Sequence, residues 1–220
     1  MRLKRYLARS LTRVGYHLRS LGFLAAIPLL VLDLLIPCLN IMDYIVYGAG
    51  DELRWNILQY SQWLMPFFSV WWALFVLREY IEGDGNELLY VYGGRCRLPD
   101  ALWLFALPLL NILLLFLCYT LVLPSMKYEF LRLLTICVFY FGVMYFLSYA
   151  AKSITITLMA LLLYTIANAA LVGNAAFPFY VSFDDLSAGL YYRQYLPLLL
   201  SGLALLTAGV FFNKRYCRFN

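Results

Sequence analysis

Residues Ala101–Leu123 read ALWLFALPLLNILLLFLCYTLVL, a stretch without a single charged side chain. A helix that crosses the hydrocarbon core of a bilayer needs about 20 mostly apolar residues. A transmembrane β-strand would alternate apolar and polar residues, and runs such as Ile112–Leu117 do not alternate. The stretch therefore predicts a transmembrane helix.

Five other stretches have the length and hydrophobicity of a membrane span: Gly22–Met42, Trp55–Leu77, Leu133–Ala151, Ser153–Val172 and Tyr195–Phe212. The composition agrees, since 64% of the 220 residues are hydrophobic and 13% are charged, against about half and a quarter in soluble domains. This composition excludes a soluble globular protein. We expect an all-α integral membrane protein whose residues 1–220 form a single domain with six transmembrane helices.

The distribution of lysine and arginine predicts how the spans are oriented. Of the 17 basic residues, 13 lie on the side of the termini, and four lie on the opposite side: Arg54, Lys127, Arg132 and Arg193. Because positive residues gather in cytoplasmic segments, we expect both termini in the cytoplasm. The net charge of +5 is therefore a topology signal and does not indicate nucleic-acid binding.

The N-terminal segment Met1–Ser20 is basic and amphipathic. Its apolar residues recur at steps of three or four, with arginine and lysine largely between them, at Leu3, Tyr6 or Leu7, Leu11, Val14 and Leu18. This pattern predicts an interfacial helix on the membrane surface. The alternative is a basic flank that only orients the first span.

The loop Arg78–Asp100 between the second and third spans is unusually acidic for a cytoplasmic loop. It holds five of the twelve acidic residues of the chain: Glu79, Glu82, Asp84, Glu87 and Asp100. Asp84 and Glu87 have the spacing of a capping box, and Gly93 follows as a stop signal. We expect a short helix over residues 84–92 that docks into a groove of a soluble partner, or else a connector packed on its own bundle.

The loop also carries a resemblance to a known family. Residues 78–89, REYIEGDGNELL, followed by Arg95 and the third span, resemble the signature of ABC-2 type permeases. In that family the second span runs into an acidic residue, a glycine-rich turn, Glu-Leu-Leu and a basic residue. Two positions depart from the pattern: Asp84 replaces a frequent threonine, and Tyr92-Gly93-Gly94 stands where a proline is common.

The resemblance covers essentially the whole chain, because the family has an N-terminal interfacial helix, six spans and cytoplasmic termini. It implies a half-size permease subunit of an ATP-driven exporter in a bacterial inner membrane. The subunit would pair with a second permease copy or relative and with two separate ATPase subunits. The loop would be the coupling helix on the ATPase, through Glu79, Glu82, Gly83, Asp84, Glu87, Leu88, Leu89 and Tyr92. The aromatic surfaces favour an amphiphilic or hydrophobic cargo, such as a lipid-linked molecule, peptide or drug.

Polar residues inside the spans are candidates for a translocation route. Asp33 lies near the middle of the first span, where a lone carboxylate is costly, and Asn40 follows on the same helix face. Gln59 and Gln62 share a face of the second span. Asn111 and Asn168 lie in the third and fifth spans. The alternative for Asp33 is a protonated carboxyl that is hydrogen-bonded to a neighbouring helix.

The external connection Gly173–Gln194 is rich in aromatic residues. The corresponding segment of ABC-2 permeases forms short re-entrant helices, whereas a plain aromatic anchor at the interface is the alternative.

No catalytic site, cofactor or metal site is expected. The sequence has no Walker A, H-E-x-x-H or G-x-S-x-G motif. ATP hydrolysis is therefore assigned to a partner subunit. Two rival functions stay open: a membrane enzyme acting on a lipid or isoprenoid with Asp33 or the Asp184–Asp185 pair at its centre, and a membrane scaffold that transports nothing.

Overall fold

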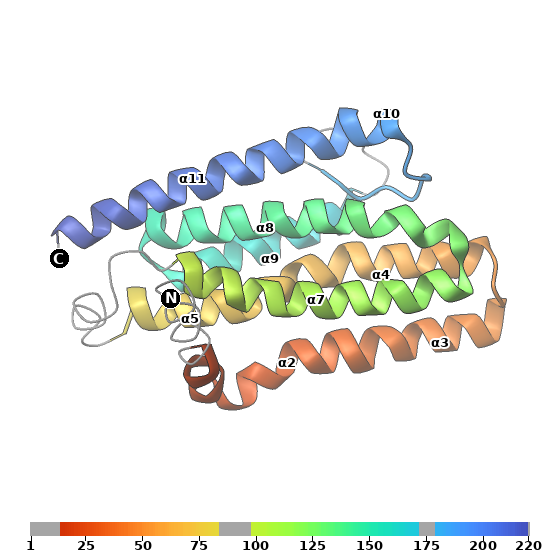
Figure 1. The fold of residues 1–220 in the computed structure, drawn as a ribbon, viewed down its shortest axis with the longest axis horizontal. Helices are drawn as coiled ribbons and strands as arrows, with labels where there is room; N and C mark the ends of the chain where they lie inside the picture. Colours follow the sequence, from red (N-terminus) through yellow and green to blue (C-terminus); the bar gives the residue numbers. More distant parts are fainter. Residues whose placement is uncertain (1–13, 84–97, 172–178, 220) are drawn as a thin grey trace, which may run out of the picture.

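The computed structural model describes residues 14–83, 98–171 and 179–219, and within these ranges it contains helices and no β-strand. Figure 1 shows long helices lying side by side along one axis. They are α2 (Ala26–Leu29) and α3 (Ile36–Tyr47), joined by a π-helical turn (Leu30–Leu35); α4 (Asp51–Ser69) and α5 (Trp71–Ile81); α7 (Leu98–Val122); α8 (Glu129–Ala151); α9 (Ile154–Ala170); and α10 (Ala188–Leu190) and α11 (Leu196–Phe219), joined by a second π-helical turn (Tyr191–Tyr195). Short 3₁₀ turns precede α2 (Gly22–Ala25) and α8 (Pro124–Tyr128).

Five helical stretches are long and apolar enough to cross a membrane: Gly22–Tyr47, Asp51–Ile81, Leu98–Val122, Pro124–Ala151 and Ala188–Lys214. They are typical of a multi-pass membrane protein. The predicted fifth span, Ser153–Val172, corresponds to α9, an apolar helix of 17 residues. That length is at the short end of the range of about 17–25 residues for a membrane span.

The second predicted span, Trp55–Leu77, is two helices and not one. The helix is interrupted at Val70, whose φ of −98° and ψ of −4° lie between α4 and α5. Pro66 precedes the break and has no backbone N–H to donate. The Ser69 hydroxyl donates to the Pro66 carbonyl at 2.7 Å. The Pro66 carbonyl thus accepts from a side chain, while the Val70 N–H bonds to the Phe68 carbonyl and does not continue the α-helical pattern.

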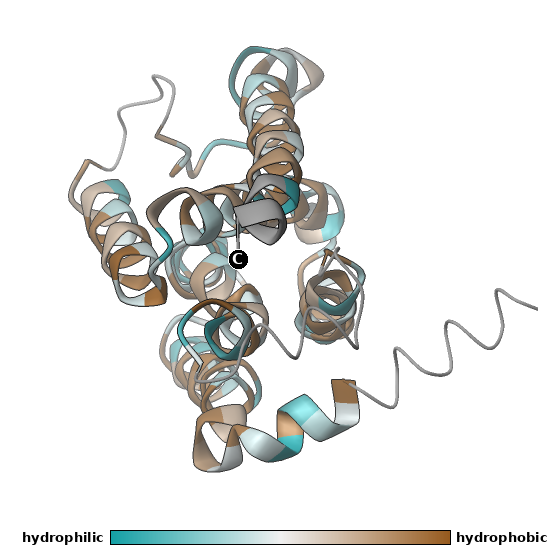
Figure 2. Ribbon diagram, turned by 90° about the vertical axis from the view of Figure 1, so that its left-hand side faces the viewer, coloured by the Kyte–Doolittle hydropathy of each residue, from teal (hydrophilic) through white to brown (hydrophobic). Residues whose placement is uncertain are grey.

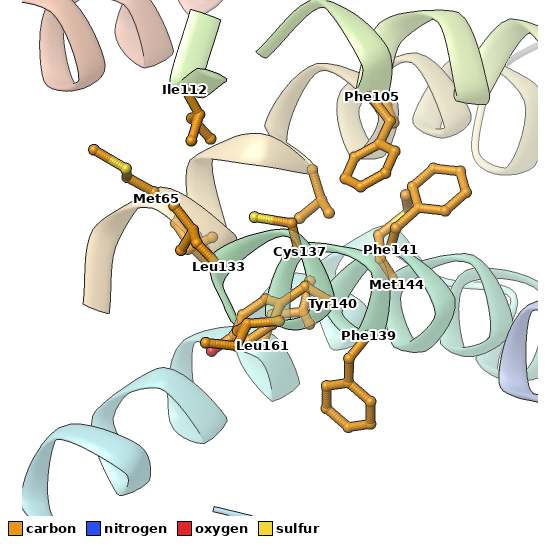
Figure 3. Packing of buried hydrophobic residues seen from close by; sticks show 14 of the residues in the cluster. Met65, Phe105, Ile112, Leu133, Cys137, Phe139, Tyr140, Phe141, Met144 and Leu161 are labelled. Atoms are coloured by element: carbon orange, nitrogen blue, oxygen red, sulfur yellow. The ribbon is translucent and has the colours of Figure 1, made fainter. Parts of the chain in front are cut away.

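The core lies where α4, α5 and α8 meet. In the most apolar 18-residue window of each stretch, 67% of the Asp51–Ile81 window and 61% of the Pro124–Ala151 window are buried, against 17% for Gly22–Tyr47. Figure 3 shows this packing: Met65 of α4, Ile112 of α7 and Leu161 of α9 surround α8. The first helix instead covers the outside of the bundle.

The exposed faces of the peripheral helices are apolar. On α7 the exposed side chains recur at steps of three and four, at Leu107, Leu110, Leu114, Leu117 and Leu121. The exposed side chains Ile156, Met159, Leu163 and Ile166 form the same kind of stripe on α9. Figure 2 shows hydrophobic residues along all the helices of the bundle. Such stripes fit contact with lipid or with another membrane protein, not with water.

Glycines allow α8 and α11 to pack closely. A Cβ atom on Gly202 would lie 2.7 Å from the Cα of Phe139, and one on Gly142 would collide with the Gly202 carbonyl oxygen. Seven residues after Gly202, a Cβ on Gly209 would lie 2.8 Å from Cδ1 of Tyr145. Small residues at helix contacts are the usual way for membrane helices to bring their backbones together.

The two ends of the bundle differ. The end where the chain finishes, called here the termini end, also holds helical residues 14–20, the end of α5 and the start of α7 and α9 (Figure 1). The opposite end, called the far end, holds the α3–α4 turn and residues 179–187. Residues 14–20 lie across the bundle and not along it (Figure 2). The predicted interfacial helix is thus helical over its described part, and residues 1–13 lie outside the described residues.

Candidate functional site

A non-helical segment is buried at the far end of the bundle. Residues 179–187 are extended, and Tyr180, Val181 and Ser182 are buried. Backbone N–H and C=O groups in such a place need hydrogen-bond partners within the protein. These partners come from several helices that are distant in sequence. The described part of the predicted external connection is therefore extended chain followed by α10, and residues 173–178 lie outside the described residues.

Gln62 of α4 holds this segment with both ends of its amide. Its Nε2 donates to the Ser182 carbonyl at 2.8 Å, and its Oε1 accepts from the Ser182 N–H at 3.1 Å. Asn168 of α9 accepts from the Tyr180 N–H at 3.1 Å, and the Tyr195 hydroxyl donates to the Tyr180 carbonyl at 2.9 Å. The side-chain amides of Gln62 and Asn168 and the hydroxyl of Tyr195 thus provide backbone hydrogen bonds that a neighbouring strand would provide in a β-sheet.

A buried arginine completes the attachment. Arg132 of α8, 1% exposed, donates to the Ser182 carbonyl at 2.6 Å and to the Asp184 carbonyl at 2.5 Å. Its Nε lies 3.1 Å from Oε2 of Glu129, which is 2% exposed. The guanidinium also lies over the Tyr195 ring at 5.3 Å from the centroid. One side chain therefore connects α8, the extended segment and the start of the last helix.

Arg54 of α4 extends this cluster to the surface. Its Nη2 lies 3.2 Å from Oε1 of Glu129 and 2.7 Å from Oδ1 of the exposed Asp185. Two arginines and two carboxylates therefore form a chain of ion pairs from the interior to solvent. The charges balance within the cluster, as buried ion pairs require.

Two buried tyrosines, Tyr180 and Tyr140, form a further set of hydrogen bonds in this part of the bundle. The hydroxyls of Tyr180 and Tyr140 are 2.9 Å apart, and the Tyr180 hydroxyl donates to the backbone carbonyl of Gln62 at 3.2 Å. Burial raises the pKa of Tyr180 well above its ordinary value. Tyr180 is therefore a neutral phenol that serves as a hydrogen-bonding anchor, not an anionic base.

Asp33 lies in the π-helical turn of the first helix and pairs with α7. The Asn111 amide donates to Oδ1 of Asp33 at 2.6 Å. Asp33 is exposed on the side of the bundle, so the carboxylate is held by one neighbouring helix and open on its other side. Both readings of Asp33, a structural hydrogen bond and a lining residue of a route, are compatible with this placement.

Asn40 also faces α7. Its Nδ2 donates to the Tyr119 hydroxyl at 2.7 Å, while its Oδ1 is buried without a hydrogen-bond partner among the described residues. Asn40 and Asp33 therefore lie along one seam between the first helix and α7. Gln62 instead holds residues 179–187 together with Arg132, Glu129 and Arg54, a group called here the far-end cluster. Gln59 is half-buried three residues before Gln62 on α4. The four proposed lining residues thus fall into two groups.

The two aspartate sites proposed for an enzyme are separate. Asp185 is bound by Arg54, and Asp184 contributes its carbonyl to Arg132. Asp33 lies fourteen residues before the end of α3, roughly 20 Å along the helix at about 1.5 Å per residue. The structure does not bring Asp33 and the Asp184–Asp185 pair into one site.

At the termini end, Glu79 contacts the chain's own N-terminal helix. Its Oε2 lies 2.9 Å from Nδ1 of His17, and its Oε1 accepts from the Ser20 hydroxyl at 2.7 Å. The Tyr80 hydroxyl lies 2.7 Å from the other ring nitrogen of His17. The last turn of α5 is therefore tied to residues 14–20.

Glu82 ties the same turn to α9. Its Oε1 accepts from the Ile154 N–H at 2.7 Å and from the Ser153 hydroxyl at 3.0 Å. A carboxylate at this place satisfies a free N–H of the first helical turn and is favoured by the helix dipole. Glu79 and Glu82, two of the three glutamates predicted to contact an ATPase, therefore also hold elements of this chain together.

Gly83 allows the chain to leave α5. A Cβ atom at this position would collide with the Glu79 carbonyl oxygen. The remaining predicted coupling residues, Asp84, Glu87, Leu88, Leu89 and Tyr92, lie outside the described residues, as does the predicted helix over 84–92.

The far-end cluster was not predicted as a unit. Arg54 and Arg132 were read as loop charges, although the i, i+3 spacing of Glu129 and Arg132 next to an apolar run is a signal for a paired charge. In the described ranges, no group of three or more His, Cys, Asp or Glu side chains could hold a metal ion. Comparison with known proteins found no matching family model, curated protein or solved structure.

Proposed function

We propose that this chain is the membrane subunit of an ATP-driven exporter of the ABC-2 permease type. Its six spans are the five long helical stretches with α9 as the sixth, and both termini lie in the cytoplasm of a bacterial inner membrane. Two separate ATPase subunits hydrolyse ATP. A second permease copy or relative completes the pathway, and the cargo is amphiphilic or hydrophobic.

The observation that carries the proposal is the attachment of α5 at the base of the predicted coupling loop. The predicted coupling helix over residues 84–92 would follow directly after Gly83, and Glu79 and Glu82 link this point to residues 14–20 and to α9. A force applied to the loop would therefore reach three elements of the bundle through short polar contacts.

The mechanism follows from these contacts. ATP-driven closure of the two ATPase subunits moves the loop, and α5 carries the displacement along its length. Residues 14–20 and α9 move with α5 because Glu79 and Glu82 hold them. The break at Val70 divides α5 from α4, so the termini end can tilt while Gln62 keeps α4 fixed to the far-end cluster.

The experiment is a substitution in the loop that leaves these internal contacts intact. Leu88→Asp places a charge on the apolar face of the expected docking helix, where an unpaired charge disfavours a buried contact. We expect copurification of the ATPase and transport-coupled hydrolysis to fall together by at least tenfold, while the chain still inserts.

The matched control is Tyr128→Asp, which introduces the same charge at an exposed position of the far end. It should leave ATPase copurification unchanged. Wild-type recovery of the ATPase with Leu88→Asp would contradict the assigned contact. Charge reversal of Glu79 or Glu82 is a poorer test, because it also breaks contacts inside the chain.

A further inference from the structure

One charged side chain is exposed near the middle of a membrane span. Asp33 lies eleven residues from Gly22 and fourteen from Tyr47, the ends of the first long apolar stretch, and it is exposed on the side of the bundle. In the described residues of the other four stretches, the exposed charged side chains lie near the ends. A carboxylate in contact with the hydrocarbon core is costly, so this face is poorly suited to lipid alone.

Asp33 is joined to Asn111 of α7, and the pair keeps unused hydrogen-bonding capacity. The Asn111 Nδ2 donates to Oδ1 of Asp33 at 2.6 Å in an exposed hydrogen bond. A side-chain amide has two N–H donors and one oxygen acceptor, and a carboxylate has two oxygens. Among the described residues, neither side chain has another hydrogen-bond partner. The pair therefore presents a free acceptor and a free donor next to each other on the outside of the bundle.

Exposed leucines surround the pair on both helices. Leu30 lies one turn before Asp33 and is 47% exposed, and Leu107 and Leu114, one turn to either side of Asn111, are 39% and 54% exposed. By contrast, the exposed stripe on α9 is apolar throughout. Polar side chains that hydrogen-bond across an apolar contact are typical of helix association in membranes. The seam between the first helix and α7 has this character, and the α9 stripe does not.

The seam is suited to a contact with an identical seam. The first helix and α7 run in the same direction, because the hydrogen-bonded pairs Asp33–Asn111 and Asn40–Tyr119 advance together along both helices. Two copies inserted in the same orientation are related by a two-fold axis along the membrane normal. An axis in front of the seam places the first helix of one copy opposite α7 of the other. Asp33 of each copy then meets Asn111 of the other at the same depth.

We propose that a second copy of this chain binds at the seam between the first helix and α7, with reciprocal hydrogen bonds between Asp33 of each copy and Asn111 of the other. A carboxylate accepts from an amide N–H, whereas a carboxyl group that carries a proton donates to an amide oxygen. The contact therefore does not require two negative charges to meet. The inference rests on the proposed function for the presence of a second permease, and it identifies that permease as another copy of this chain.

The test uses the full chain in membranes without ATPase, in a background that lacks the five native cysteines. Two differently tagged versions are expressed together, one with Leu30→Cys and one with Leu107→Cys, so that Asp33 and Asn111 stay intact. A disulfide that joins the two tags can form only between copies. We expect oxidation to give a dimer that carries both tags. The matched control replaces Leu30→Cys by Leu163→Cys, at an exposed position of α9, and should give at least tenfold less dimer.

Variants separate the polar pair from the apolar surface around it. Association is measured by energy transfer between labelled copies of the purified chain, diluted stepwise with phospholipid. Asn111→Leu removes both reciprocal hydrogen bonds and should weaken association about tenfold. Asp33→Asn keeps an acceptor and a donor and should associate like the wild type. Thr207→Leu is the control, because this exposed hydroxyl on α11 bonds the Ala204 carbonyl of its own helix, and it should leave association unchanged.

Equal cross-linking of Leu107→Cys to Leu30→Cys and to Leu163→Cys would overturn the inference, as would a chain that stays monomeric in lipid or unchanged association of Asn111→Leu. None of these measurements involves the ATPase. A monomeric chain that still binds the ATPase would leave the exporter proposal in place, with a relative as the second permease. A dimer through the seam that binds no ATPase would overturn the exporter proposal alone.

Discussion

Arg132 shows how one residue can hold a non-helical segment inside a membrane bundle. Its guanidinium donates to two carbonyls of the extended segment and lies against Glu129. Lysine could not reproduce this, because its ammonium lacks the planar fork of donors. The attachment of residues 179–187 thus depends on the shape of the side chain as well as on its charge.

Removing the guanidinium should be strongly destabilising. Arg132→Leu leaves Glu129 with only Arg54 and leaves the Asp184 carbonyl without its donor. Breaking a buried ion pair by removing one partner costs about 3–5 kcal/mol, and we expect a clear fall in the unfolding temperature in detergent. Arg193→Leu, at an exposed position, is the control and should change it little. Equal unfolding temperatures for the two variants would show that the cluster contributes nothing to stability.

At the scale of elements, the α8–α11 contact depends on the absence of side chains. Gly202→Leu would place a side chain where even a Cβ lies 2.7 Å from the Cα of Phe139. Overpacking typically costs about 1–3 kcal/mol, and at a backbone contact we expect the upper part of that range. Gly189→Leu is the matched control, because no atom lies within 4 Å of a Cβ at that glycine. Thermal unfolding of both variants checks this, and a smaller loss for Gly202→Leu than for Gly189→Leu would contradict the packing.

The sequence predicted the helices better than their connections. The length of an apolar run determines where a span can be, so the cores of Ala101–Leu123 and Leu133–Ala151 lie inside α7 and α8. The break at Val70 was not predicted, because the apolar run continues through this position. The π-helical turn at Asp33 has no comparable local signal.

The far-end cluster was out of reach for a different reason. Gln62 and Ser182 are 120 residues apart in sequence, and no local pattern links an amide on one helix to a distant backbone. Counting basic residues to find the orientation treats Arg132 as a solvated loop charge, whereas the side chain is 1% exposed and paired. Long-range pairing of polar groups, unlike hydrophobic length, becomes visible only in three dimensions.

At the scale of the whole molecule, the orientation of the bundle can be tested by labelling. The excess of lysine and arginine on the side of the termini predicts that the far end lies outside. In a background without other cysteines, Lys127→Cys should react with an impermeant maleimide on intact cells, whereas Cys217 should react only after permeabilisation. Reaction of both positions from the same side would contradict the orientation and the six-span topology.

The proposed exporter function requires partner chains in addition to this one. A lone chain leaves apolar stripes on α7 and α9 uncovered and Asp33 exposed on the side of the bundle. These features agree with a surrounding of lipid and a second permease, but they do not name an ATPase. Only the composition of the assembly in its native membrane identifies an ATPase as a partner.

The most direct measurement is therefore the native mass of the assembly that copurifies with the tagged chain from gently solubilised membranes. We predict two permease chains and two ATP-binding subunits, with ATP hydrolysis in the purified assembly. Recovery of this chain by itself, or only with proteins that bind no nucleotide, would contradict the proposed function.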